Sequence, residues 1–135
     1  MIEIRFSGIR RGGPMCPPDW IEKIIVKTLR VEKASDWQMG VLITDNKEIQ
    51  RLNKKFLNHD CATDVIAFNL GPRLGDIVVS AQMAKTVARQ LNISFREELA
   101  RYLVHGTLHV LGYRDKTVKD RKKMWERQER ILSEA

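Results

Sequence analysis

The sequence predicts an α+β protein of one domain, with a mixed sheet of about four strands and helices packed mainly on one face. Short segments alternate apolar and polar residues, as half-buried strands do, and longer segments with helical spacing lie between them. Some connections are too short for the crossover that parallel neighbours require, so part of the sheet is antiparallel. With 135 residues and neither a repeat nor a linker, we expect residues 1–135 to form a single domain.

The first half of the chain predicts two strands and two helices. Apolar residues alternate at Ile2, Ile4 and Phe6 and again at Met39, Val41 and Ile43. Asp19 and Asp45 are each followed three residues later by a glutamate, a pattern typical of helix starts. The predicted elements are a strand over 1–7, a loop over 8–18, a helix from an Asp19 N-cap to about Leu29, a strand over 37–44, and a helix from an Asp45 N-cap to Phe56.

The second half predicts a strand pair followed by three helices. Gly71 and Pro72 separate two short apolar segments, and Ser94 with Glu97 forms a capping box. Gly112 suits the left-handed position just after a helix. The predicted elements are strands over 63–70 and 75–80, and helices over 80–91, from Ser94 to near Gly112, and over 117–132.

Charge and cysteine content narrow the class of protein. The formal net charge of +7 favours polyanionic partners such as nucleic acids. Cys16 and Cys61 lie far apart without CxxC spacing, so a disulfide framework is not expected, and a reducing, cytoplasmic location fits best. No apolar run is long enough to span a membrane, and the N-terminus has no central apolar block of a signal peptide.

The helix that begins at Ser94 carries the candidate site, at the end of a largely buried element. Its polar stripe includes His105 and His109, one turn apart on the same side, which lets both rings reach one ion. Gly112 can turn the chain back so that Asp115 supplies a third ligand and leaves a position open for water. The alternative is two core imidazoles satisfied by hydrogen bonds. Position 106 is glycine, so the general-base glutamate of HExxH peptidases is missing.

The segment His105-Gly-Thr-Leu-His-Val-Leu-Gly-Tyr113 resembles the signature helix of the YbeY family, bacterial metal-dependent endoribonucleases of ribosomal RNA maturation. Upstream segments match further family blocks in the same order: Ile43-Thr-Asp45, Leu52-Asn53, Asp60, Thr63-Asp64-Val65 and Leu74-Gly-Asp-Ile77. Met124 and Ile131-Leu132 fit the family's C-terminal helix, so the resemblance covers nearly the whole chain.

Three positions depart from the family pattern. Asp115 stands where the family has its third zinc-binding histidine, and Arg114 replaces the aspartate before it. An anionic ligand should make a bound water less acidic and can shift the choice of metal. Leu57 stands where the family usually has a phosphate-handling arginine, so Asn58, His59 or another basic residue would have to replace it. His59 itself replaces a lysine and could contact phosphate, or be merely solvated.

The resemblance implies a metal-dependent endoribonuclease, with one Zn²⁺ or another divalent ion held by His105, His109 and Asp115. The implied partners are RNA, above all ribosomal RNA and the small ribosomal subunit, with roles in 3′-end processing and ribosome quality control. His59 and Arg114 are candidates for phosphate handling, and Asp64, Asp76 and His59 for a general base. The alternatives are a non-catalytic RNA-binding assembly factor with a structural metal and a metallohydrolase acting on a substrate other than RNA.

Overall fold

The computed structural model describes residues 1–8 and 16–134. The predicted loop over 8–18 falls largely on residues 9–15, including Arg10 and Arg11, which lie outside the described residues. The strands are β1 (Ile2–Phe6), β2 (Gln38–Thr44), β3 (Val65–Gly71) and β4 (Leu74–Ser80). The helices are α1 (Pro18–Val31), α2 (Asn46–Leu57), α3 (Ala81–Leu91), α4 (Phe95–Val110) and α5 (Val118–Ser133).

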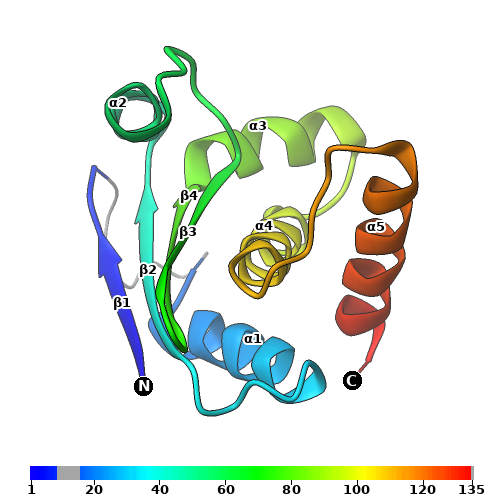
Figure 1. Cartoon of the computed structure of the whole chain (residues 1–135). Helices are drawn as coiled ribbons and strands as arrows, with labels where there is room; N and C mark the ends of the chain where they lie inside the picture. Colours follow the sequence, from blue (N-terminus) through cyan, green and yellow to red (C-terminus); the bar gives the residue numbers. More distant parts are fainter. Residues whose placement is uncertain (9–15, 135) are drawn as a thin grey trace.

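The four strands form one mixed sheet, as the sequence predicted, and their order is β1-β2-β4-β3 (Figure 1). β1, β2 and β4 are parallel, and Val41 of β2 pairs with Ile4 on one side and Ile77 on the other. β3 runs antiparallel to β4 and joins it through a tight turn at Pro72 and Arg73. This hairpin is the short connection that excluded an all-parallel sheet.

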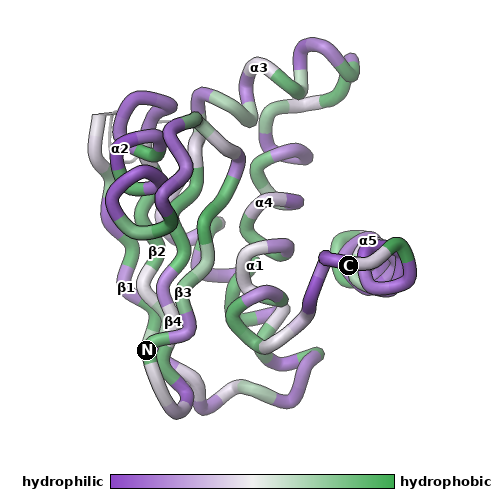
Figure 2. Tube along the Cα trace, turned by 45° about the horizontal axis from the view of Figure 1, so that its top comes forward, coloured by the Kyte–Doolittle hydropathy of each residue, from purple (hydrophilic) through white to green (hydrophobic). Residues whose placement is uncertain are grey.

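The helices lie mainly on one face of the sheet, which confirms the prediction. α1 and α3 both pack against α4 on that face, α5 packs on α4, and α2 packs on the opposite face (Figure 1). Alternating residues of a strand face opposite sides of the sheet, which explains why there are two clusters of buried residues. Ile77 and Val79 belong to the large core beside α4. Ile66 and Val78 belong to a smaller cluster with Ile49 of α2. α2 is mainly hydrophilic along its trace in Figure 2, as expected for a helix with one narrow buried face.

The start of α1 differs from the prediction. Asp19 is not the N-cap: the helix begins at Pro18, with Pro17 in the N-cap position and Asp19 in the first turn. A proline at the first helical position loses nothing, because its missing N–H would have had no partner inside the helix. Asp19 can still interact favourably with the helix dipole. The predicted caps at Asp45 and Ser94 are confirmed by hydrogen bonds to the N–H groups of Glu48 and Glu97.

α4 lies between the sheet and α5, and a glycine brings it close to the strands. A Cβ atom at Gly106 would come within 2.7 Å of Val65 Cγ2 and 3.1 Å of Ile77 Cγ2. Position 106, where HExxH peptidases have their glutamate, therefore has no side chain here, and this lets α4 pack closely on β3 and β4. Among residues 1–8 and 16–134, no helix combines the length and apolar character needed to cross a bilayer.

Candidate metal centre

The two histidines of α4 project from the same side of the helix, as their spacing predicted. The ring centroids of His105 and His109 are 4.6 Å apart, with an interplanar angle of 81°. Both residues are half-buried, whereas most of their neighbours on α4 are fully buried. The pair thus lies at an edge of the core that solvent can reach.

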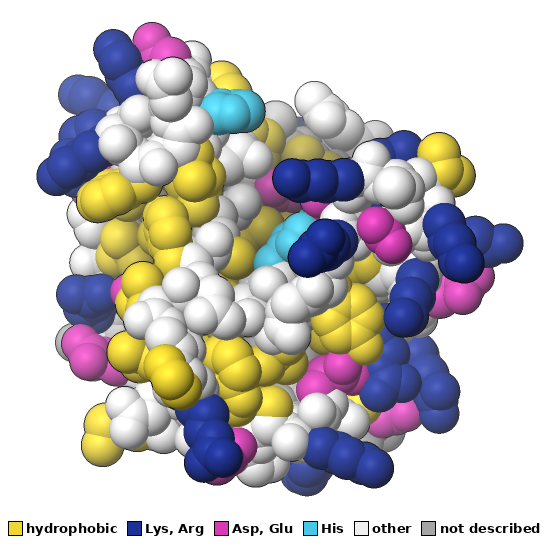
Figure 3. Space-filling model, in the orientation of Figure 1, with side chains coloured by type: hydrophobic (Ala, Val, Ile, Leu, Met, Phe, Trp, Pro, Cys, Tyr) yellow, Lys and Arg dark blue, Asp and Glu magenta, His cyan; other side chains and the backbone are white. Residues whose placement is uncertain are grey.

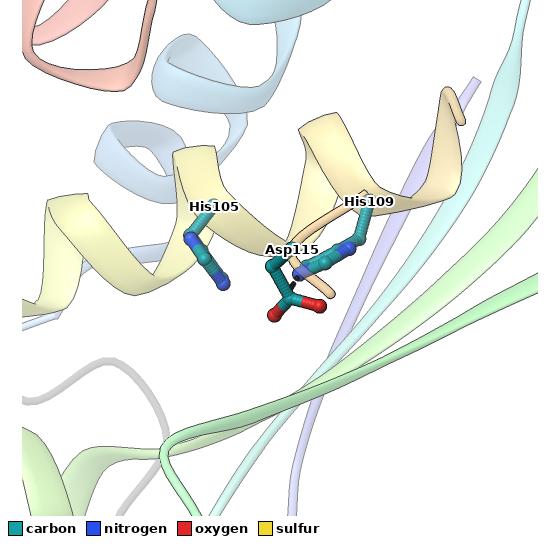
Figure 4. Close-up of side chains that lie close together, drawn as sticks. All are labelled: His105, His109 and Asp115. Atoms are coloured by element: carbon teal, nitrogen blue, oxygen red, sulfur yellow. Dashed lines mark ion pairs between the residues drawn. The ribbon is translucent and has the colours of Figure 1, made fainter. Parts of the chain in front are cut away.

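The turn after α4 brings the third predicted residue to the pair. Gly112 has φ of 106°, and its N–H donates to the carbonyl of His109 at 3.0 Å. The N–H of Tyr113 donates to the carbonyl of Leu108 at 3.1 Å. These two bonds form a Schellman motif, which ends the helix and reverses the chain. Figure 4 shows Asp115 directed at the two imidazoles, with its Oδ2 3.2 Å from His109 Nε2.

Hydrogen bonds determine which nitrogen of each imidazole faces the space shared by His105, His109 and Asp115. His105 Nδ1 donates to Gln128 Oε1 at 2.9 Å, and His109 Nδ1 donates to the carbonyl of Tyr113 at 3.0 Å. Both partners are oxygen acceptors, so in each neutral ring the proton belongs on Nδ1 and the Nε2 lone pair is left unprotonated. His109 Nε2 and Asp115 Oδ2 are then two acceptors 3.2 Å apart. Such a contact is favourable only with a proton or a cation between them.

The donor set fits a divalent ion. One donor atom from each of His105, His109 and Asp115 lies within 4.8 Å of the other two. The 3.2 Å between His109 Nε2 and Asp115 Oδ2 is close to the roughly 3.3–3.6 Å that separates two donors on a tetrahedral ion with bonds of about 2.0–2.2 Å. Two imidazoles and one carboxylate form a set used by catalytic zinc, which leaves a coordination position open. Non-haem iron uses a similar set.

The electrostatics of His105 favour the ligand form. Burial is the main cause that lowers the pKa of His105, and repulsion from His109 lowers it further. The hydrogen bond to Gln128 and the charges of Asp64 and Asp115 oppose this shift without cancelling it. The imidazole is therefore neutral near pH 7, and its Nε2 is available for a cation without first losing a proton.

The structure does not bring His59 or Arg114 into the donor group. His59 is exposed in the connection between α2 and β3, and Figure 3 shows one histidine patch over that connection and a separate one over α4. Arg114 is exposed beside Asp115 and lines a cavity of about 330 Å³ together with Asp120 and Lys123. Lysine and arginine side chains flank the histidine patch over α4 in Figure 3. Roles in phosphate handling stay predictions for both residues.

The two candidate acids lie on different sides of the sheet. Asp64 precedes β3, and its negative charge acts on His105. Its Oδ1 accepts from the Val65 N–H at 2.7 Å and from Thr63 Oγ1 at 3.2 Å, so the carboxylate also holds the backbone at the start of β3. Asp76 alternates with Ile77, whose side chain faces Gly106 of α4, so Asp76 belongs to the opposite face. Asp76 is therefore excluded as a general base for this site.

Sequence reasoning missed two groups that hold the histidines. Gln128 is 3% exposed on α5, between the buried Met124 and Ile131. A glutamine on the apolar face of an otherwise charged helix is the signal that could have revealed it. Tyr113 supplies the carbonyl for His109, while its hydroxyl donates to Glu32 Oε1 at 2.6 Å. Arg127 donates to the other oxygen of Glu32, also at 2.6 Å.

Comparisons with known proteins agree on one family. The family model described as Endoribonuclease YbeY matches residues 17–135. Proteins named Endoribonuclease YbeY are 38% identical in Fusobacterium nucleatum (84% of this chain, 78% of that protein) and 41% identical in Oceanobacillus iheyensis (74% and 75%). The solution structure of TM1509 from Thermotoga maritima is similar, with a TM-score of 0.70 and 28% identity over 98% of this chain and 87% of that one. By its sequence, its mixed sheet and its histidine helix, the chain belongs to the YbeY family.

Proposed function

We propose that the protein is a metal-dependent endoribonuclease that cleaves single-stranded RNA, with His105, His109 and Asp115 as the ligands of one divalent ion, most simply Zn²⁺. The observation that carries this proposal is the convergence of His105, His109 and the Asp115 carboxylate at a solvent-reachable edge, with the Nδ1 atom of each imidazole engaged by an oxygen acceptor. The Asp115 side chain is 49% exposed, so the open side of the group faces the solvent. A substrate can approach from that side.

The family supports RNA as the substrate, because the relatives compared above are named endoribonucleases. The net charge of +7 also favours a polyanion. By the resemblance of its motifs, we further propose ribosomal RNA as the physiological substrate, with 3′-end processing of the small-subunit RNA and ribosome quality control in the cytoplasm as the setting.

The chain's own residues bind and orient the reactants. A divalent ion at this site supplies Lewis-acid polarisation of a phosphodiester and activation of water. His105 and His109 are held in one orientation by their Nδ1 hydrogen bonds, so the position of the site is fixed before substrate arrives. Arg114 lies next to Asp115 in sequence and can contact a phosphate bound there. Asp64 is an acid whose negative charge acts on His105, and it is the proposed candidate for proton transfer.

Elemental analysis combined with RNA cleavage tests the proposal. The purified protein should hold one divalent ion per chain and cleave an unstructured RNA internally. Asp115→Ala should lose both the ion and the cleavage while keeping the circular-dichroism spectrum of the parent protein. Asp60→Ala is the matched control, because Asp60 is an exposed acid that contacts Gln50 and Lys54 away from the site.

The two alternative functions predict different results from the same samples. An RNA-binding factor with a structural metal predicts that Asp115→Ala or His109→Ala unfolds the protein, while the metal-loaded parent protein binds RNA without cleaving it. A metallohydrolase of another substrate predicts a bound ion and turnover of a peptide or small ester with intact RNA. Either result would overturn the endoribonuclease proposal.

A further inference from the structure

We propose that Gln128 is a positioning residue that selects the metal-binding tautomer of His105, and that a chain of side chains from α5 back to α4 holds it in place. This inference rests on the proposed metal site and names a device that the ligand set alone does not reveal. The chain runs from Arg101 through Glu129 and Gln128 to His105. The two end residues of this hydrogen-bonded series, Arg101 and His105, are both on α4, and the two middle residues are on α5, which lies beside α4 (Figure 1).

The first step is the orientation of the Gln128 amide. An amide can turn either its oxygen or its nitrogen toward a neighbour, and the two choices have opposite effects on an imidazole. Gln128 Nε2 donates to Glu129 Oε2 at 3.2 Å, which directs Oε1 toward His105. With the oxygen on its side, His105 must place its proton on Nδ1, and Nε2 keeps its lone pair.

The second step is the anchoring of Glu129. Arg101 Nε lies 3.1 Å from Glu129 Oε2, and Arg101 Nη2 lies 3.1 Å from Glu129 Oε1, so the pair is bidentate. The guanidinium also contacts Glu97 and Glu98 on its own helix. Arg101 is thus fixed on α4, and it holds the Glu129 carboxylate in the orientation that accepts from Gln128.

Because these hydrogen bonds are buried, they can select one tautomer of His105. Gln128 is 3% exposed, so water can scarcely replace either of its hydrogen bonds. Without the Gln128 oxygen, His105 would have a buried Nδ1 without that acceptor. The proton would then be free to occupy Nε2, the atom that must face the ion. Binding a cation would first require a change of tautomer, which lowers the affinity of the site.

Gln128→Met tests the inference, because methionine has a similar shape and offers no amide oxygen. Long-range ¹H–¹⁵N spectra of the metal-free protein should show His105 protonated on Nδ1 in the parent and partly on Nε2 in the variant. Zn²⁺ affinity, measured by competition with a chromophoric chelator, should fall by roughly 10–100-fold. Thr28→Val is the matched control, since it removes another buried hydrogen bond, to the carbonyl of Ile24, and should change neither result.

An exchange of the two neighbours provides the rescue. Gln128→Glu combined with Glu129→Gln keeps the charge of the pair and keeps an oxygen acceptor beside His105, so affinity should return to within about threefold of the parent. If Gln128→Met does not fold, Glu129→Ala releases the amide at a more exposed position and should also place part of the proton on Nε2. An unchanged His105 tautomer in a folded variant, or Zn²⁺ affinity within twofold of the parent, would overturn the inference. Both readouts are independent of RNA cleavage, so failure of the proposed function would be seen separately.

Discussion

At the scale of single residues, the site depends on where each imidazole keeps its proton. His105 and His109 both donate Nδ1–H to oxygen acceptors, one from a side chain and one from the backbone. This leaves two lone pairs and the Asp115 carboxylate directed at the same place. Three electron-rich atoms that converge within 4.8 Å of one another are stabilised by a cation or proton among them. The charge and identity of the third ligand should therefore decide how tightly an ion binds.

Substitution of Asp115 should separate the need for a ligand from the need for a charge. Asp115→Ala removes a donor atom and should weaken Zn²⁺ binding by more than the roughly 10–100-fold typical of losing an indirect partner. Asp115→His restores a neutral donor and should retain the ion at one per chain. Chelator competition measures both affinities. Equal affinity in the Ala variant and the parent would remove Asp115 from the ligand set.

The pH dependence of stability should report on His105. Burial lowers the pKa of His105 in the folded protein below its ordinary value near 6.5, so the unfolded chain takes up the proton first as pH falls. The stability tied to neutral His105 is therefore fully present above about pH 6.5 and is lost as pH falls from there toward the lowered folded-state pKa.

Urea denaturation of the metal-free protein at pH 7.5 and pH 5.5 measures this loss. His105→Asn should reduce the difference between the two midpoints, whereas His59→Asn, at an exposed position, should leave it as in the parent. A midpoint difference that is the same with and without His105 would contradict the assignment.

At the scale of elements, α4 and the turn that follows it act together. Ser94 starts the helix, Gly106 seats it on β3 and β4, and Gly112 ends it in a left-handed conformation. Because the reversal at Gly112 carries Asp115 back over the histidines, the backbone of one glycine sets the position of a candidate ligand two residues beyond Tyr113. Helix geometry therefore places two of the candidate ligands, and the helix end places the third.

Gly112→Ala should damage both stability and the metal site. An alanine at a φ of 106° is strained by about 1–2 kcal/mol, although a Cβ there would meet no atom within 4 Å. Relief of the strain moves the segment that holds Asp115, so Zn²⁺ affinity should fall together with the melting temperature. Gly71→Ala is the matched control: Gly71 has φ of 143° and equally open space, but lies in the β3–β4 hairpin. It should lower the melting temperature and leave Zn²⁺ affinity unchanged.

At the scale of the whole molecule, charge and topology have separate roles. The net charge of +7 attracts RNA at long range, whereas the sheet and helices set where the chemistry takes place. α5 contributes to both the charge and the site, because its exposed side is highly charged and its buried Gln128 forms a hydrogen bond with His105. Figure 3 shows basic side chains beside the histidine patch over α4, where a phosphate backbone would meet the site.

Binding of single-stranded RNA should therefore weaken with salt. Three phosphate contacts correspond to a loss of roughly 20-fold in affinity between 50 and 200 mM salt, from a slope of about −0.7 per contact. Arg114→Gln should make the slope shallower by about 0.7, whereas Lys23→Gln, at an exposed position of α1, should leave it unchanged. Fluorescence anisotropy with a labelled RNA and a catalytically inactive Asp115→Ala protein gives both slopes. Equal slopes for Arg114→Gln and the parent would place Arg114 outside the RNA contact.

Much of this protein could be predicted from the sequence, because local rules act over a few residues. Alternation predicted the first two strands, and short apolar segments on either side of a turn predicted the other two. Aspartate-then-glutamate and serine-then-glutamate patterns predicted two of the caps, and the pairing of His105 with His109 followed from helical spacing. Asp19 was the exception, since two prolines before it provided a better helix start. Asp115 was placed correctly beside the histidines because Gly112 signals a chain reversal by itself.

Only the tertiary structure decided which distant groups surround those residues. Gln128 reaches His105 from α5, and Glu32 at the end of α1 accepts a hydrogen bond from Tyr113. Asp76 faces away from the site, whereas the next residue, Ile77, packs against Gly106 of the histidine helix. The sequence determined which three residues converge as candidate ligands, because a helix and its end have fixed geometry. The partners that set proton positions and accessibility come from elements joined by long-range packing, and packing depends on all the side chains at once.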